Sequence, residues 1–240
     1  MNEVSPHEFG FELRVCAWAE REWEPGDDSP CIVARQLGTQ YRRWDTVIVE
    51  CDPDGFSSRQ DLGKRALDSD LLDVVPHAPD NWEWYRDALP NPGYPWRYVR
   101  ETIHRADDRN LIETRRIIAV ENKPDLDASA ARALANQVER DVALGIADEV
   151  WVATRSTDAA VEPVLLEDLP VEAGVIVFDS AMDPSVIWHP RSLPVSESGT
   201  RITSRGEGVT CFEYVGADWK RKKRVEIAER AFSKGWRSYI

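Results

Sequence analysis

The segment that most constrains the fold covers residues 115–123 and reads RRIIAVENK. A β-branched apolar run of this length is typical of a buried strand, and Pro124 ends it because proline cannot donate to the ladder. Side chains alternate across a strand, so Glu121 and Lys123 share one face with Ile117, with roughly 6–7 Å between their two Cα atoms. A carboxylate and an amine therefore project together from the end of an apolar strand. Such a pair marks either a strand end reaching solvent or half of a metal-dependent site.

A second strand is predicted over residues 42–50, RRWDTVIVE, where β-branched residues alternate with others. Asp45 shares a face with Val47 and lies where the apolar run begins, so pairing of the two strands would bring Asp45 beside Glu121. Two carboxylates suit Mg²⁺, or Mn²⁺ in its place, because hard cations prefer oxygen ligands and retain waters. A lysine beside such a site can orient or deprotonate a metal-bound water.

The remaining pattern alternates helices with strands. Helices are predicted over residues 6–24, 127–148 and 218–236, and strands over 149–154, 174–179 and 208–215; CIVARQLG, 31–38, is ambiguous between the two. This order predicts an α/β fold with a mixed central sheet flanked by helices.

Together, Asp45 on one strand and Glu-x-Lys at the end of another resemble the PD-(D/E)XK nuclease superfamily. The resemblance covers about residues 8–154. It implies a restriction-endonuclease-like core that uses Mg²⁺ to hydrolyse phosphodiester bonds in DNA. Asp45 and Glu121 would hold the metal, and Lys123 would position or activate water.

Two further residues extend the resemblance. The superfamily tends to carry a glutamate on a preceding helix, matched here by Glu12 or, less well, Glu8. It often carries a glutamine on the helix after Glu-x-Lys, matched by Gln137, and that helix leads directly into a strand. Asp141 lies one turn after Gln137 on the same face, where it either supports the site or is an ordinary helix charge.

The sequence also departs from the superfamily pattern. Trp44, not proline, precedes Asp45, and the literal Pro53-Asp54 lies in a turn-like segment, so Asp54 ranks second as the metal ligand. The gap between Asp45 and Glu121 is long for this fold and requires an insertion, which costs little closure entropy.

The expected domain organisation follows from that insertion. Residues 1–54 and 111–215 form the two parts of the nuclease-like core, 55–110 form the insertion, and 216–240 form a basic C-terminal helix. The insertion is either a loose structural one, which is the preferred interpretation, or one of which part resembles a winged-helix element. The whole chain also resembles a haloarchaeal family of uncharacterised proteins with signatures like IENKPDL and DEV-ATxS.

Charge suggests a salt-adapted protein. The 240 residues carry a net charge of -13, and six of the 30 basic residues are lysines. High net charge maintains solubility, and concentrated salt screens the resulting self-repulsion. The acidic N-terminus lacks the features of a signal peptide, so a halophilic, cytoplasmic protein is expected. The scattered four cysteines and four histidines give little support to a zinc or Ser-His-Asp hydrolase.

The C-terminal segment has the opposite charge. From Gly216 onward eight basic residues face three acidic ones, a balance of 8 − 3 = +5. This asymmetry predicts contacts with a phosphate backbone or, alternatively, an ordinary solvated helix. The residues expected to bind nucleic acid are Lys220, Arg221, Lys222, Lys223 and Arg224. DNA is therefore the expected partner, a homodimer is plausible if both strands are cut, and the alternative function is a non-catalytic nucleic-acid- or partner-binding module on the same fold.

Overall fold

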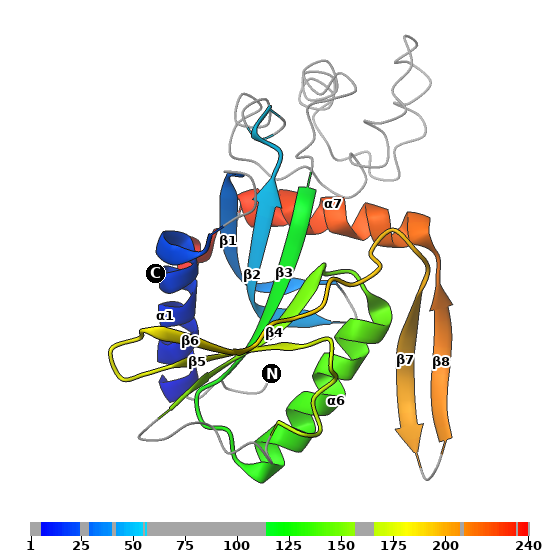
Figure 1. Cartoon of the computed structure of the whole chain (residues 1–240). Helices are drawn as coiled ribbons and strands as arrows, with labels where there is room; N and C mark the ends of the chain where they lie inside the picture. The colour runs from blue at the N-terminus through cyan, green and yellow to red at the C-terminus, as the bar shows by residue number, and fades with distance from the viewer. Residues whose placement is uncertain are drawn as a thin grey trace.

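The computed structural model describes residues 6–24, 29–39, 42–54, 56, 114–156, 166–206, 209–233 and 235–239 (Figure 1). Apart from Phe56, the predicted insertion at 55–110 and its winged-helix-like part lie outside these residues. Phe56 itself packs on the core, with its ring centroid 5.9 Å from that of Phe232.

A six-stranded sheet forms the centre of the molecule, with strand order β1-β2-β3-β4-β5-β6. Its strands are β1 (Cys31–Gly38), β2 (Arg43–Cys51), β3 (Thr114–Lys123), β4 (Glu149–Arg155), β5 (Gly174–Phe178) and β6 (Pro184–Trp188). The first three strands pair antiparallel, β3, β4 and β5 pair parallel, and β6 returns antiparallel. The predicted mixed α/β sheet is confirmed.

Strands β2 and β3 are direct neighbours, although about sixty residues separate them in the sequence. Val47 pairs with Ala119 and Thr46 with Val120, so the antiparallel register continues to place Asp45 opposite Glu121. The pairing expected from the sequence is therefore correct. Strand β2 ends at Cys51 and β3 begins at Thr114, which are at the end of this pair opposite to Asp45 and Glu121.

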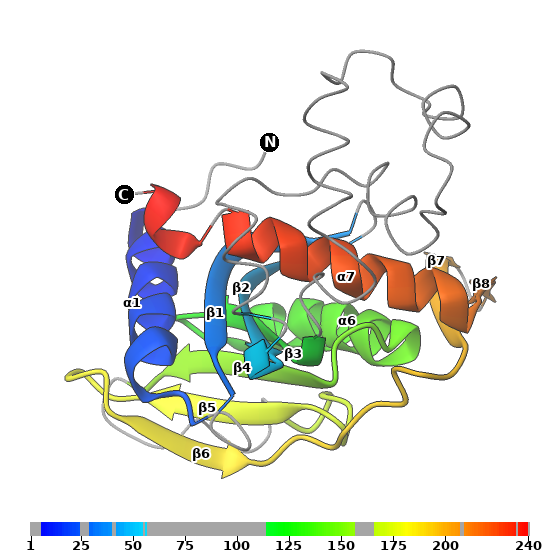
Figure 2. The same ribbon diagram turned by 90° about the horizontal axis from the view of Figure 1, so that it is seen from above.

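Helices cover both faces of the sheet. Helix α1 (Pro6–Glu22) packs on one face, where Phe11, Val15 and Trp18 are buried against strand side chains including Ile118. Helices α6 (Ala128–Leu144) and α7 (Ala217–Ser233) pack on the other face (Figure 2). The alternation of strand residues divides the apolar side chains between these two layers, so Glu121 and Lys123 emerge on the α6 side.

Helix α6 has well-defined ends. Asp127 caps its N-terminus by accepting from the backbone N–H groups of Ser129 and Ala130, both at 2.8 Å. Gly145 ends it with φ +60°, and a Cβ there would come within 3.0 Å of Lys220 Nζ. The chain then passes into β4, which pairs parallel to β3. The expected helix is thus four residues shorter than predicted at its C-terminal end.

A two-stranded hairpin, β7 (Gly199–Gly206) and β8 (Val209–Val215), stands outside the main sheet. Strand β7 packs against α6, and β8 leads into α7 (Figure 1). A short 3-10 helix, η4 (Trp236–Tyr239), follows α7. The sequence predicted β8 but neither β7 nor β6; β6 is exposed along its whole length and so lacks a buried-strand pattern. No helix in the described ranges is both long and apolar enough to cross a membrane.

Candidate functional site

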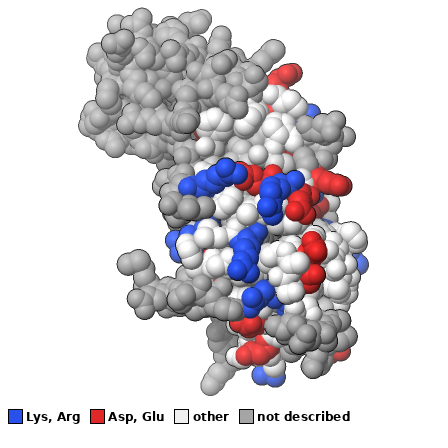
Figure 3. Space-filling view, turned by 90° about the vertical axis from the view of Figure 1, so that its left-hand side faces the viewer, with Lys and Arg blue, Asp and Glu red and all other residues white. Residues whose placement is uncertain are grey.

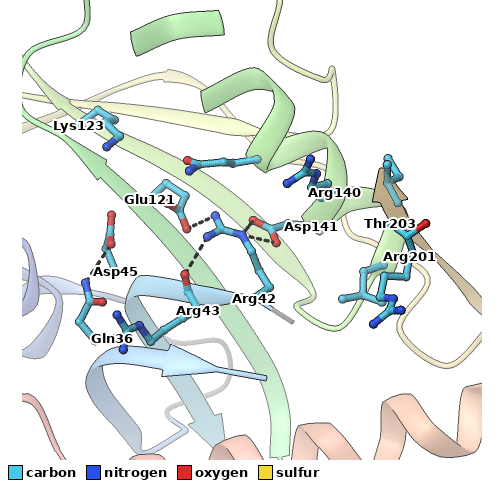
Figure 4. A pocket seen from close by; sticks show the side chains of 13 residues that line it. Gln36, Arg42, Arg43, Asp45, Glu121, Lys123, Arg140, Asp141, Arg201 and Thr203 are labelled. Carbon is cyan, nitrogen blue, oxygen red and sulfur yellow. Dashed lines mark hydrogen bonds and ion pairs between the residues drawn. The ribbon is translucent and has the colours of Figure 1, made fainter. Parts of the chain in front are cut away.

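A cavity of about 860 Å³ lies where the start of β2 and the end of β3 meet α6 and β7 (Figure 4). Its lining is mostly polar and carries both signs of charge. The lining residues are Gln36, Arg42, Arg43, Asp45, Glu121, Lys123, Gln137, Arg140, Asp141, Leu144, Arg201, Ile202 and Thr203. Four residues singled out from the sequence, Asp45, Glu121, Lys123 and Gln137, are thus brought together, and Asp141 joins them.

The two carboxylates expected to bind metal lie on adjacent strands. Asp45 is half-buried and accepts two hydrogen bonds, from Gln36 Nε2 at 3.0 Å and from the backbone N–H of Asn122 at 2.9 Å. Glu121 is only 3% exposed, and its Oε1 has no hydrogen-bond partner among the described residues. Asp45 is therefore held by neutral donors, whereas Glu121 depends on a charge for compensation.

That charge comes from Arg42, which immediately precedes β2. Its Nε donates to both carboxylate oxygens of Asp141, at 3.0 and 3.1 Å, and its Nη2 lies 2.5 Å from Glu121 Oε1. The Nη2–Oε1 contact is an ion pair without hydrogen-bond alignment, since both atoms still lack a hydrogen-bond partner. Nη1 donates to the carbonyl of Arg43 at 2.8 Å. The guanidinium therefore lies between two buried carboxylates (Figure 4).

Burial shifts the carboxyl groups of Glu121 and Asp141 toward their neutral forms. Burial raises the pKa of Glu121 well above its usual value, and the charge of Asp45 adds to this, while Arg42 opposes it. Burial also raises the pKa of Asp141 to about 6, against the lowering effect of Arg42. Burial alone would lower the pKa of the Arg42 guanidinium, but Glu121 and Asp141 outweigh it and raise that pKa. Arg42 therefore stays charged and partly stabilises both carboxylates.

Lys123 and Gln137 complete the part of the cavity around the end of β3. The Lys123 ammonium is partly exposed and lies 3.9 Å from Glu8 Oε1. Gln137 is half-buried on α6, and its buried Oε1 has no hydrogen-bond partner within the described ranges. An amide oxygen facing a polar cavity without a partner can accept from a bound ligand or water.

Glu12 does not line the cavity but is linked to it. It is 3% exposed on α1 and accepts from Arg35 Nη2 at 2.9 Å and Gln36 Nε2 at 2.8 Å. The same Gln36 nitrogen donates to Asp45, so one amide bridges the two carboxylates. Burial raises the pKa of Glu12, against the Gln36 hydrogen bond, and Asp45 raises it further. Glu12 thus acts on the site through Gln36 and not by direct contact.

Gln36 adopts a conformation that is unusual for its residue type. Its φ is +52°, in the left-handed region that costs a non-glycine residue roughly 1–2 kcal/mol. It lies opposite Asp45, between the paired residues Arg35–Thr46 and Leu37–Trp44. Strain of this kind persists where surrounding contacts require it, and here it directs the amide onto Glu12 and Asp45.

The basic C-terminal segment differs from expectation. Lys220 is fully buried, its Nζ donates to the Pro194 carbonyl at 2.9 Å, and desolvation lowers its pKa. Arg224 donates to the Ile146 carbonyl at 2.6 Å and pairs with Asp148 at 2.8 Å. Lys220 therefore anchors α7 to the segment between β6 and β7, and Arg224 anchors it to the chain before β4. Their predicted contact with nucleic acid stays a prediction, with neither side chain exposed.

The other three basic residues of this segment reach solvent to different degrees. Lys223 pairs with Glu226 at 2.5 Å and is only partly exposed. Arg221 is exposed and pairs with Asp218 at 3.0 Å, and Lys222 is exposed. Their predicted contact with a phosphate backbone stays a prediction. Asp54, the second-ranked metal ligand, is exposed in a turn in which its N–H donates to Asp52, and it does not line the cavity.

Several residues of the cavity escaped the sequence analysis. Arg42 was only the first residue of a predicted strand, and no role was predicted for it. Its long side chain contacts Asp141 on α6, ninety-nine positions away. Gln36 lay in a segment of ambiguous type, and Arg201 and Thr203 carry no local signal. Arg140 lies three positions after Gln137 on α6, so the helical face could have indicated it.

Oxygen ligands in the cavity suit a hard divalent cation. Within the described part of the chain, no group of three or more His, Cys, Asp or Glu side chains is arranged to hold a metal ion. The available pair is Asp45 and Glu121, and Glu121 offers a buried oxygen without a hydrogen bond. These two carboxylates would supply part of the oxygen ligands of a divalent cation, and water would supply the others.

The fold and the cavity define a class of protein: a mixed α/β protein with a polar pocket, lined by both acidic and basic side chains, at the end of its central antiparallel strands. The chain belongs to the family described as "Family of unknown function (DUF5787)", which it matches over residues 32–117 and 114–240. No curated protein and no solved structure matches the chain.

Proposed function

We propose that the protein is a PD-(D/E)XK-type nuclease that hydrolyses phosphodiester bonds in DNA with the help of Mg²⁺. One observation carries the proposal: Asp45, Glu121, Lys123 and Gln137 come from three separate elements and line the same cavity. The elements also follow the order that the resemblance implies, with a helix bearing Glu12 before the core and a helix bearing Gln137 that leads into a strand.

Asp45 and Glu121 would hold the divalent cation through carboxylate oxygens. When bound, the cation would supply Lewis-acid activation of water and neutralise charge on the phosphate. Lys123, whose ammonium is partly exposed at the end of β3, would orient the attacking water or take its proton. Gln36 and Glu12 would hold Asp45 in place, since the Gln36 amide donates to both carboxylates.

The charge of the cavity walls supports a phosphate-containing substrate. Arg140 on α6 and Arg201 on β7 line the side of the cavity opposite Asp45 and Lys123 (Figure 4). Guanidinium groups bind phosphate oxygens with directed, charge-assisted hydrogen bonds. The pocket therefore combines carboxylates for a cation with arginines for an anion, which is the combination that phosphodiester hydrolysis needs.

A nicking assay tests the proposal. Supercoiled and branched DNA are incubated with the protein and Mg²⁺ in molar KCl, and nicked products are quantified on gels. We expect Lys123→Ala to slow nicking by about 10²-fold or more, as removal of a general base does, and Asp45→Ala to abolish it by removing a metal ligand.

Asp125→Asn is the matched control, because Asp125 is exposed just beyond β3 and does not line the cavity. It should nick at the wild-type rate. Unchanged nicking in both Lys123→Ala and Asp45→Ala would refute the proposed mechanism.

The second candidate function is a non-catalytic module that binds nucleic acid or a partner on the same fold. The observation that favours it is Arg42, whose guanidinium compensates Glu121 without any metal. This function predicts DNA binding that weakens with salt, persists in EDTA and is unaffected by Glu121→Ala. Fluorescence anisotropy with a labelled duplex distinguishes it from the nuclease.

A further inference from the structure

Arg42 occupies the centre of a cluster of acidic side chains. Its guanidinium contacts Glu121 and Asp141, and Asp45 is the next carboxylate whose charge acts on it. Glu121 and Asp141 are 3% and 2% exposed, so water compensates little of their charge. Buried carboxylates require a paired cation, and among the described residues Arg42 is the cation in contact with both.

The backbone of Arg42 is anchored, whereas its side chain has a route to solvent. Thr39 accepts from the Arg42 N–H through Oγ1 at 3.2 Å, and its own N–H donates to the Arg42 carbonyl at 2.7 Å. The Arg42 side chain is 17% exposed to solvent, and its Nη2 has no hydrogen-bond partner among the described residues. A change of rotamer alone can therefore move the guanidinium out of the cluster.

We propose that Arg42 is the resident cation of this pocket and competes with a divalent cation for Glu121 and Asp141. Binding of the divalent cation displaces the guanidinium, which then faces the cavity and can bind a phosphate oxygen of the substrate. The exchange makes Asp141 part of the cation site, a role that no sequence motif assigned to it. The inference rests on the proposed function only in requiring that the pocket bind a divalent cation.

The exchange follows from charge. The Arg42 guanidinium is the cation in direct contact with Glu121 and Asp141, while Lys123 acts on Glu121 and Arg140 acts on Asp141 through longer-range charge. A divalent ion placed at these carboxylate oxygens compensates them better than a single positive charge does. A guanidinium near the ion would repel it, so the two cations exclude each other from the same oxygens. The cost of displacing Arg42 lowers the apparent affinity for the ion, as in any competition between two ligands for one site.

Direct Mn²⁺ binding tests this without an activity assay. Protein freed of metal with EDTA is titrated with Mn²⁺, and binding is followed by calorimetry and by the loss of the free-ion signal in electron paramagnetic resonance. We expect Arg42→Gln to bind Mn²⁺ at least about tenfold more tightly than wild type because the competing cation is gone. Arg42→Lys, which keeps the charge but not the fork, should lie between them.

Arg43→Gln is the matched control, since Arg43 is the next residue, lines the same cavity and has an exposed side chain. It should change Mn²⁺ affinity by no more than about threefold, because solvent screens an exposed charge. Thermal unfolding gives a second readout. Arg42→Gln leaves two buried carboxylates uncompensated and should unfold at a lower temperature than wild type, and saturating Mn²⁺ should raise its midpoint by more.

The outcomes separate the two proposals. Equal or weaker Mn²⁺ binding by Arg42→Gln than by wild type overturns the exchange but leaves the nuclease proposal standing, because the wild type still binds the ion. Absence of Mn²⁺ binding by wild type and every variant overturns both. Tighter binding by Arg42→Gln together with unchanged nicking in both Lys123→Ala and Asp45→Ala supports the exchange and refutes the proposed nuclease mechanism.

Discussion

At the scale of single residues, the site depends on carboxylates that are costly to ionise. Glu121 and Asp141 lie in the interior, and their pKa values are raised by burial before any neighbour acts on them. A carboxyl group whose folded pKa exceeds its unfolded value binds more protons in the folded state. Its ionisation therefore destabilises the fold as pH rises above the unfolded pKa, and that loss continues until the folded pKa is reached.

This gives a pH-dependent prediction for Glu121→Gln. With EDTA present, wild type should lose stability relative to the variant as pH rises from 5 to 7, by at most about 1.4 kcal/mol per pH unit for one group. The glutamine cannot ionise, so the variant lacks this component of the pH dependence. Urea unfolding at several pH values measures the difference. A constant stability difference over this range would show that the Glu121 pKa is not raised.

Gln36 shows how backbone strain and hydrogen bonding combine at one position. Its positive φ disfavours a side chain, yet its amide links Glu12 to Asp45. Alanine at this position would keep the strain and lose the bridge, whereas glycine would lose both. The pair of variants therefore separates the two contributions.

We predict that Gln36→Gly is more stable than Gln36→Ala by about 1 kcal/mol, because glycine accepts the left-handed conformation without steric cost. Both variants should weaken Mn²⁺ binding alike, since each removes the donor that orients Asp45. Urea unfolding and calorimetry are the two measurements. Equal stability of the two variants would mean that the positive φ carries no strain.

At the scale of elements, α6 and α7 position charges in different ways. Helix α6 presents Gln137 and Asp141 to the cavity because they lie one turn apart on the same face of the helix. Helix α7 is basic along one segment, but Lys220 and Arg224, also one turn apart, point into the protein and bind backbone carbonyls. The segment between them, with Arg221 and Lys222, faces solvent.

This division predicts opposite effects for two lysines only two positions apart. Lys220→Met should change the free energy of unfolding by removing a buried hydrogen bond, typically worth about 1–3 kcal/mol when a partner is left unsatisfied, with little effect on DNA affinity. Lys222→Ala should leave stability unchanged and, if α7 contacts phosphates, weaken binding and reduce its salt dependence. Urea unfolding and anisotropy measure both. Equal loss of DNA affinity in the two variants would contradict the structural role of Lys220.

At the scale of the whole molecule, the excess of acidic residues does not make every part of the described surface acidic. On the side where α1 lies, basic and acidic side chains lie close together (Figure 3), as in the pair of Arg237 and Glu20 at 2.5 Å. A net charge of -13 therefore coexists with a pocket that four arginines help to line. Local charge, and not the total, decides which ligands the pocket accepts.

Much of the central architecture could be predicted because it depends on local periodicity. The β-branched runs around Val47 and Ile117 predicted two strands, and alternation predicted which face carries Asp45, Glu121 and Lys123. The ends of these strands were correct to within one residue. Strands β6 and β7 could not be predicted, since β6 is exposed on both faces and β7 follows no strict alternation.

The sequence by itself determined the order of the central elements and the polar residues that end them, since apolar periods of two and 3.6 follow from backbone geometry alone. Only the tertiary structure decided what compensates those residues. Arg42 reaches Asp141 across ninety-nine positions, and Gln36 joins Glu12 on a helix to Asp45 on a strand. Lys220 is likewise buried, and its ammonium donates to the carbonyl of Pro194, twenty-six positions away. Contacts between distant residues depend on how the helices pack on the sheet. The local sequence around each residue therefore does not predict which distant residue it contacts.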